Sequence, residues 1–167
     1  MRHGGMCGVL VQMAALAVPL PLAASAQVTE RVSVSSAGQE GNGQSGFYDP
    51  AISADGVVAA FASFASNLVP GDTNGAWDVF VHDREAGTTQ RVSVTPAGGE
   101  ASGDSGGDWS LQTNGVDLSA DGRWVAFFST APDLVPLDGN GTAAIFVRDL
   151  LLGLTVRVSV PSAGGEA

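Results

Sequence analysis

A block of sequence recurs along this chain at intervals of 60 to 66 residues. The tetrapeptide Arg-Val-Ser-Val stands at residues 31–34, 91–94 and 157–160, and Ser-Ala-Asp-Gly stands at residues 53–56 and 119–122. From each Asp-Gly to the next Arg-Val-Ser-Val the two copies align without a gap. A repeat of this length restricts the chain to an array of similar supersecondary units, each of which buries its apolar surface against a neighbour.

Each copy contains four short segments that are typical of β-strands, because they are rich in Val, Phe, Trp and Thr and are separated by turn residues. The Asp-Gly pairs predict tight hairpins, and Gly87 is the expected left-handed residue of a further hairpin. Four antiparallel strands without a helix are typical of a propeller blade. We expect strands at residues 51–53, 57–63, 78–83 and 89–94 in the first copy, and at residues 116–119, 123–129, 144–149 and 155–160 in the second.

The order of the motifs resembles a known repeat family. Ser-Ala-Asp-Gly is followed by Val-Ala-Phe, then by Asn-Leu-Val-Pro, Val-Phe-Val-x-Asp and Arg-Val-Ser-Val. This order is similar to that of the TolB-like (WD-like) β-propeller repeat of exported bacterial proteins, and the resemblance covers residues 29–167. It implies an all-β fold of four-stranded antiparallel blades. It also implies roles such as periplasmic interaction, secreted repeat arrays and non-catalytic partnership with peptidase domains.

The repeat divides the chain into segments with different expected roles. Propellers close with about four to eight blades, so two complete blades with an N-terminal extra strand predict an incomplete propeller, the N-terminal part of a longer one. The alternatives are a ring assembled from several copies and a two-blade unit packed face to face. We expect a signal peptide at residues 1–26, the N-terminal strand and linker at 27–46, blade 1 at 47–94, a Gly/Ser-rich loop at 95–109, blade 2 at 110–160 and the start of a truncated third repeat at 161–167.

The N-terminal segment predicts export to the periplasm or the extracellular space. An apolar run from Val9 to Leu22 precedes Ala24-Ser25-Ala26, an A-x-A cleavage site that would leave Gln27 as the mature N-terminus. The run is too short for a transmembrane span, so no membrane insertion is expected after cleavage. Cys7 is lost with the signal peptide, so the mature chain would be stabilised by packing without disulfides.

The charge of the chain restricts its partners. The formal net charge is −10 and no lysine occurs. Nucleic-acid binding depends on a basic surface, so nucleic acid is excluded as an expected partner. Protein partners are expected instead, and unpaired sheet edges predict self-association as well.

An acidic loop in the first copy is a candidate calcium site. Asp72, Asn74 and Asp78 place oxygen side chains around a glycine turn, and calcium prefers carboxylate, amide and carbonyl oxygens. The alternative is an Asx turn, in which Asn and Asp side chains bond nearby backbone N–H groups. In the second copy Ala144 replaces Asp78, which weakens the metal interpretation there. No other cofactor is predicted.

The pentapeptide Gly-Asp-Ser-Gly-Gly at residues 103–107 matches the sequence around the nucleophile of trypsin-like proteases. A nucleophilic serine needs a histidine base and an orienting acid. After the signal peptide the only histidine is His82, which is expected to be an exposed residue on an outer strand. We therefore interpret residues 103–107 as a flexible surface loop, and we predict no catalytic residue.

Three tryptophans and two aspartates complete the candidates. Trp124 is expected in the core, whereas Trp77 and Trp109 flank loops and are compatible with either core or binding roles. Asp83 and Asp149 occupy the same position in the two copies and are expected to cap the hairpin before the fourth strand.

The sequence thus predicts a non-catalytic exported module for protein–protein interaction or scaffolding. One alternative is the non-catalytic propeller portion of a larger peptidase or hydrolase. The other is a calcium-stabilised secreted repeat or adhesion protein.

Overall fold

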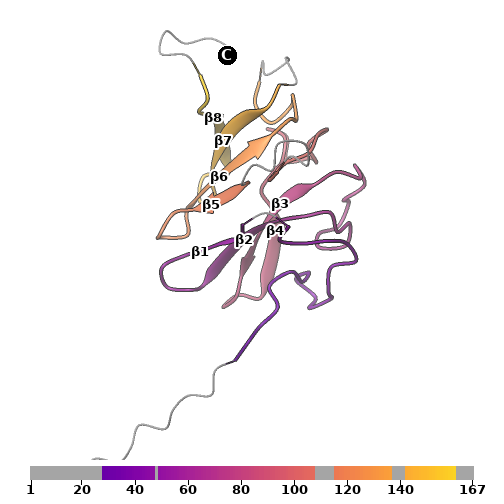
Figure 1. The fold of residues 1–167 in the computed structure, drawn as a ribbon, viewed down its shortest axis with the longest axis vertical. Helices are drawn as coiled ribbons and strands as arrows, with labels where there is room; N and C mark the ends of the chain where they lie inside the picture. Colours follow the sequence, from indigo (N-terminus) through magenta and orange to yellow (C-terminus); the bar gives the residue numbers. More distant parts are fainter. Residues whose placement is uncertain (1–27, 48, 108–114, 137–141, 161–167) are drawn as a thin grey trace, which may run out of the picture. The chain divides into compact units, whose positions relative to one another are not determined.

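Two four-stranded antiparallel sheets follow one another along the chain in the computed structural model (Figure 1). The structure describes residues 28–47, 49–107, 115–136 and 142–160, so the predicted signal peptide, Trp109 and residues 161–167 lie outside it. Among the described residues there is no helix, and hence none that could span a membrane.

Each strand pairs with its neighbour in the sequence, which is the up-and-down order of a propeller blade. The all-β blade fold predicted from the repeat is therefore confirmed. The first sheet consists of β1 (Ala51–Ile52), β2 (Val58–Ser63), β3 (Asp78–Asp83) and β4 (Thr88–Arg91), and the second of β5 (Val116–Leu118), β6 (Trp124–Ser129), β7 (Ala144–Asp149) and β8 (Leu154–Arg157).

The two sheets have the same register. Phe61 lies opposite Phe80 across β2 and β3, and Phe127 lies opposite Phe146 across β6 and β7. The ring centroids are 6.0 Å apart in the first pair and 5.9 Å apart in the second, with an interplanar angle of 28° in both. Since cross-strand aromatic pairs stabilise a sheet, each copy is built around the same buried pair.

The hairpins form where the sequence predicts them. Gly56 and Gly122 have φ angles of 74° and 70°, and Gly87 has a φ of 64°, the left-handed conformation that favours glycine. The carboxylate of Asp83 accepts hydrogen bonds from the backbone N–H groups of two following residues, and Asp149 does the same in the second copy. The predicted capping role of both aspartates is confirmed.

The larger core lies between the two sheets. Ala60, Val79 and Val81 project from one face of the β1–β4 sheet and pack into the same apolar cluster as Phe127 and Phe146 of the second sheet. A backbone hydrogen bond of 2.9 Å from the N–H of Ala54 to the carbonyl of Ala120 also joins the copies. One face of each sheet is therefore buried in a contact between repeats.

A smaller core covers the other face of the first sheet. Phe61 and Phe80 are buried there together with Leu68, and Val32 packs against them. The hydroxyl of Thr89 on β4 donates to the carbonyl of Val34. The segment that precedes the first blade thus runs across this face and closes it.

The predicted fourth strands, residues 89–94 and 155–160, are longer than the observed ones, which end at Arg91 and Arg157. Beyond Arg91 a side chain replaces a backbone partner, because the N–H of Val79 donates to the hydroxyl oxygen of Ser93 at 3.1 Å. Val94 then turns away and forms an isolated bridge with Glu100. The sequence pattern continues, but the ladder does not.

The N-terminal extra strand also differs from expectation. Residues 31–34 form no ladder with another strand of the described chain, and only Val34 makes a bridge, to Glu40. Arg-Val-Ser-Val forms a strand end only where a third strand precedes it, as β3 precedes residues 91–94.

Two side chains are buried in the opposite sense to the predicted one. His82 is buried, and its Nδ1 lies 2.8 Å from Oγ1 of Thr89, because its face of β3 is covered by the N-terminal segment. Trp124 is 41% exposed and stacks against the guanidinium of Arg123, whose carbon lies 4.9 Å from the ring centroid. The exposed strand position for His82 and the core position for Trp124 were both wrong. Trp77 is a core residue, with its ring 5.9 Å from that of Phe64.

Candidate functional site

Arg91, the last residue of β4, lies within an acidic cluster at the end of the first blade. Its side chain is only 8% exposed, and its Nη1 lies 3.1 Å from a carboxylate oxygen of Asp78, 3.4 Å from Glu100 and 3.6 Å from Asp72. The guanidinium thus supplies a positive charge to three carboxylates. Without it, burial would leave like charges facing one another.

Asp78 is the most deeply buried acid of this cluster. It begins β3, its side chain is 1% exposed, and it accepts hydrogen bonds from Arg91, Asn74 and Ser93. Burial raises the pKa of Asp78, and the hydrogen bond from Ser93 and the charge of Arg91 oppose that rise. Burial and repulsion by Asp78 raise the pKa of Asp72, again against the effect of Arg91. Both acids therefore depend on the arginine to keep their charge.

The structure brings the three predicted calcium ligands, Asp72, Asn74 and Asp78, into this cluster. The amide oxygen of Asn74 accepts a hydrogen bond of 3.0 Å from the backbone N–H of Ala76, which is the predicted Asx turn. Its Nδ2 donates to Asp78 and to the carbonyl of Ala101. In the described part of the chain, no group of three or more His, Cys, Asp or Glu side chains has the arrangement of a metal site. Calcium binding here stays a prediction, and the guanidinium already provides a cation among the carboxylates.

Glu100 fastens the chain after β4 to the connection between β2 and β3. Its carboxylate accepts bonds of 2.8 Å from the backbone N–H and 2.6 Å from the hydroxyl of Thr73, and these bonds lower the pKa of Glu100. The preceding repeat has a related pair, because Nη1 of Arg31 lies 2.7 Å from Glu40. That pair is exposed, so the buried cluster is particular to the first blade.

Ser105, the serine of Gly-Asp-Ser-Gly-Gly, is buried and has a structural role. Its hydroxyl lies 2.8 Å from that of Ser129, and its N–H donates to the carbonyl of Trp77 at 2.7 Å. The side chain of Asp104 accepts a 2.8 Å bond from the N–H of Trp77. The interpretation of residues 103–107 as a flexible surface loop was wrong, because this stretch connects the two blades.

A second copy of this motif was missed in the sequence. Gly43-Gln44-Ser45-Gly46 precedes Gly103-Asp104-Ser105-Gly106 by 60 residues, the same interval as the Arg-Val-Ser-Val motifs. The hydroxyl of Ser45 lies 2.8 Å from that of Ser63, as in the second copy. The recurrence marks a structural element of the repeat and separates it from the protease motif that it resembles.

Gly106 lies where the blades approach each other most closely. Its φ is 88°, and a Cβ atom added to it would lie 2.6 Å from Cβ of Ala62 and 2.9 Å from Cγ2 of Val79. Its N–H donates to the carbonyl of Phe128. The glycine therefore contacts the first sheet through its backbone while it is bonded to the second.

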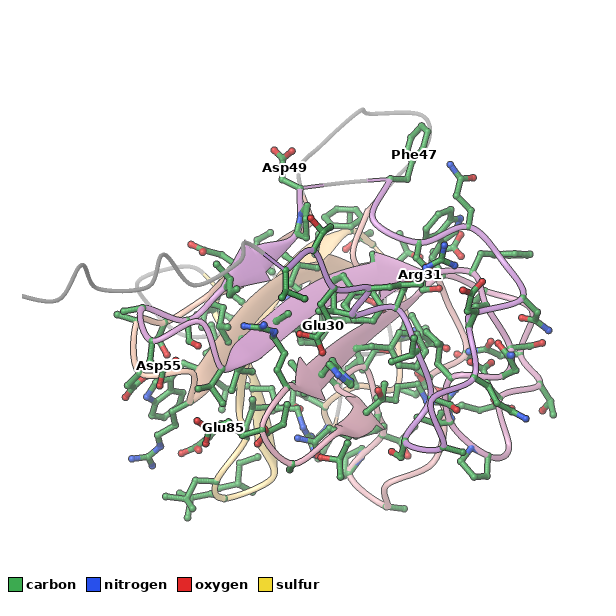
Figure 2. All side chains as sticks on the ribbon, turned by 90° about the horizontal axis from the view of Figure 1, so that it is seen from below. Glu30, Arg31, Phe47, Asp49, Asp55 and Glu85 are labelled. Carbon is green, nitrogen blue, oxygen red and sulfur yellow. The ribbon has the colours of Figure 1, made fainter. Side chains whose placement is uncertain are left out.

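The face of the second sheet that points away from this contact is apolar and open. Ile145 of β7 is 41% exposed, whereas Val79, at the same position in the first copy, is 0% exposed. A hollow of about 330 Å³ lies on this face, with Asp49, Asp117 and Phe128 among its lining residues. Figure 2 shows Asp49 ahead of the short strand β1, and Asp55 in the turn beyond it. We call this surface the open face and define it by residues Trp124, Ala126, Phe128, Ile145, Val147, Leu154, Val156 and Val158.

Asp149 at the margin of the open face predicts a pH dependence of stability. Arg123 donates bonds of 3.0 and 2.6 Å to this carboxylate and lowers its pKa from 3.8 to about 2. A lowered pKa in the folded state contributes stability above pH 4 that is lost as the pH falls from about 4 to 2. We expect Asp149→Asn to lower the melting temperature at neutral pH, and the deficit to shrink across that acid range.

Melting temperatures measured from pH 7 to pH 2 test this expectation. Asp83→Asn is the matched control, because Asp83 caps the equivalent hairpin with Val57 at the position of Arg123. A deficit of Asp149→Asn that stays constant down to pH 2 would contradict the role assigned to Arg123.

Comparison with known proteins gives a likeness in structure only. No family model matches the sequence, and no curated protein matches it. The structure is similar to that of a putative TolB from Agrobacterium tumefaciens, with a TM-score of 0.41 and 20% identity over 67% of this chain and 30% of that chain. It is also similar to TolB from Acinetobacter baumannii, with a TM-score of 0.24 and 16% identity over 72% of this chain and 33% of that chain. The chain spans about a third of the length of these solved structures, and it resembles TolB as the order of its motifs predicts.

Proposed function

We propose that this chain is an exported, non-catalytic module of blade type that binds another protein. The open face is the observation that supports this function most strongly. It presents Trp124, Ile145, Val156 and Val158 to solvent on a rigid sheet. Contiguous exposed apolar surface on a folded protein marks an interaction site.

The chemistry of the Ser105 motif supports a non-catalytic role. A nucleophilic serine must be accessible and hydrogen bonded to a base, but Ser105 is buried and its hydroxyl lies beside that of Ser129. The imidazole of His82 lies beside the hydroxyl of Thr89 instead. A structural role accounts for both polar side chains.

Export belongs to the same proposal. Its support is the apolar segment that ends in Ala24-Ser25-Ala26. Cleavage there would leave a chain that begins at Gln27 and carries both blades to an oxidising compartment without a cysteine.

Site-specific photocrosslinking in the producing cells tests the function. A photoreactive amino acid at position 156 of the open face should give a protein adduct of defined mass after irradiation. The same group at position 52 is the control, because Ile52 is 58% exposed but lies on the first sheet. Equal or absent adducts at the two positions would count against an interaction module. Mass spectrometry of the adduct identifies the bound protein.

A further inference from the structure

The open face of the second sheet differs from its counterpart in the first copy. The counterpart is buried by the following blade, and its Val79 and Val92 are both 0% exposed. At the matching positions of the second sheet, Ile145 is 41% exposed and Val158 is 46% exposed. This side of a blade is therefore a contact surface, and in the second copy no described residue covers it to the same extent.

A blade of the ordinary type does not fit on the open face in the same way. In the observed contact, Gly106 packs so closely against Ala62 that a Cβ atom would lie 2.6 Å from the alanine Cβ. In the second sheet Phe128 stands at the position of Ala62. The benzyl group would occupy the space that the glycine segment of another blade needs, so a different packing is required.

The open face is also more apolar than its counterpart. Leu154 and Val156 on β8 stand where β4 has Thr88 and Gln90. Trp124 stands where β2 has Val58. Exposed outer-strand positions are normally polar, so larger apolar side chains at three exposed positions indicate a surface that is buried in an assembly.

We propose that the open face binds the open face of a second copy of this chain, so that two β5–β8 sheets pack against each other around a two-fold axis. This inference rests on the proposed interaction function and names its partner. Two sheets pack face to face at about 10 Å through interdigitated apolar side chains. A two-fold contact between identical patches is the commonest way in which identical subunits associate.

The remaining surfaces favour this partner. The opposite apolar face of the first sheet, with Phe61 and Phe80, is closed by the segment around Val32. A second copy thus offers its own open face as its complementary apolar surface. Asp149 at the margin is already neutralised by Arg123, so the face requires no basic partner although the chain carries a net charge of −10.

The hollow on the open face adds shape to the contact. It has a volume of about 330 Å³ and lies between residues 115–117 and the side chains of Phe128 and Ile145. An aliphatic side chain of the facing sheet can enter it and remove its apolar wall from water. Burial of such a central side chain in a pocket is the usual source of affinity at an interface.

Sedimentation of the purified mature chain over concentrations from about 1 µM to 1 mM tests the proposal. The wild type should shift reversibly from monomer to dimer and should form no larger species. The double variant Leu154→Thr/Val156→Gln, which restores the residues of the first blade, should weaken the dimer at least tenfold. Because β4 carries these residues in the same fold, the variant should keep the wild-type circular dichroism spectrum.

The control variant and the contrary outcomes are equally defined. Ile52→Thr, on an exposed position of the other sheet, should leave the dissociation constant unchanged. A wild type that stays monomeric throughout, a dimer that the double variant does not weaken, or open-ended association would each overturn the proposal. An adduct with a different protein at position 156, together with a monomeric pure chain, would leave the interaction function in place and remove the second copy as its partner.

Discussion

Replacement of Arg91 by methionine is expected to destabilise the chain by about 3–5 kcal/mol, the usual cost of breaking a buried charge pair by removing one partner. The variant keeps a side chain of similar length but leaves Asp78, 1% exposed, without the guanidinium 3.1 Å away. Asp72 and Glu100 lose the same counter-charge. Urea unfolding should show a lower midpoint with an unchanged slope.

Acid should partly reverse this loss. Burial already raises the pKa of Asp78 and of Asp72, and loss of Arg91 raises both pKa values further. The folded variant then binds protons at a higher pH than the unfolded chain, so its stability should recover as the pH falls from 7 towards 4. Calcium should raise the melting temperature of the variant only if the acidic loop binds the ion.

Arg31→Met is the matched control for the arginine. Arg31 occupies the same position of the preceding repeat, but its ion pair with Glu40 is exposed. Exposed pairs contribute about 0–1 kcal/mol, so this variant should unfold near the wild-type midpoint. Equal losses for the two arginines would show that burial of the cluster does not determine its contribution.

Replacement of Gly106 by alanine is expected to cost about 2–5 kcal/mol. One part is the left-handed backbone, about 1–2 kcal/mol for a residue with a Cβ atom. The other part is overpacking of about 1–3 kcal/mol, because the new methyl group would meet Ala62 and Val79 at 2.6 and 2.9 Å. The measurement is again the free energy of unfolding in urea.

Gly46→Ala separates the two contributions. Gly46 is the equivalent residue of the first copy, with a φ of 68°, and nothing lies within 4 Å of the added methyl group. Its variant should show only the cost of the backbone conformation. If Gly46→Ala and Gly106→Ala were equally destabilised, the close approach of the two blades at Gly106 would have no energetic weight.

The strands were predictable because their signals are local. Asp78–Asp83 and Ala144–Asp149 have the predicted bounds, since each is a short apolar run between turn residues. The glycine of each hairpin was equally clear, because only a residue without a Cβ atom adopts the left-handed conformation at no cost. The interval between repeats then fixed the number of sheets.

The burial of single side chains could not be predicted because it depends on contacts between distant segments. His82 is covered by a segment that lies about 50 residues earlier in the sequence, as the bond between Ser36 and Thr89 on the neighbouring strand shows. Trp124 has the composition of a core residue, but its side of the sheet is the open face. Alternation along a strand indicates which residues share a face, and it does not indicate which face is covered.

The candidate site was only partly visible in the sequence. The proximity of Asp72, Asn74 and Asp78 was foreseeable from their spacing in one loop. The entry of Arg91 among them was not, because it arrives from another strand. The structural role of Ser105 had a signal in Ser45, 60 residues earlier, which the likeness to a protease motif obscured.

The twelve residues between 95 and 106 have a consequence for the modularity of the chain. Glu100 in this stretch is bonded to Thr73 of one blade, and Ser105 is bonded to Ser129 of the next. A chimera joined anywhere within it would deprive one of the two sheets of a native partner. Exchange of repeats, by recombination or by design, should therefore succeed best when the junction falls between Gly107 and Gly115, where the two copies already differ in length by six residues.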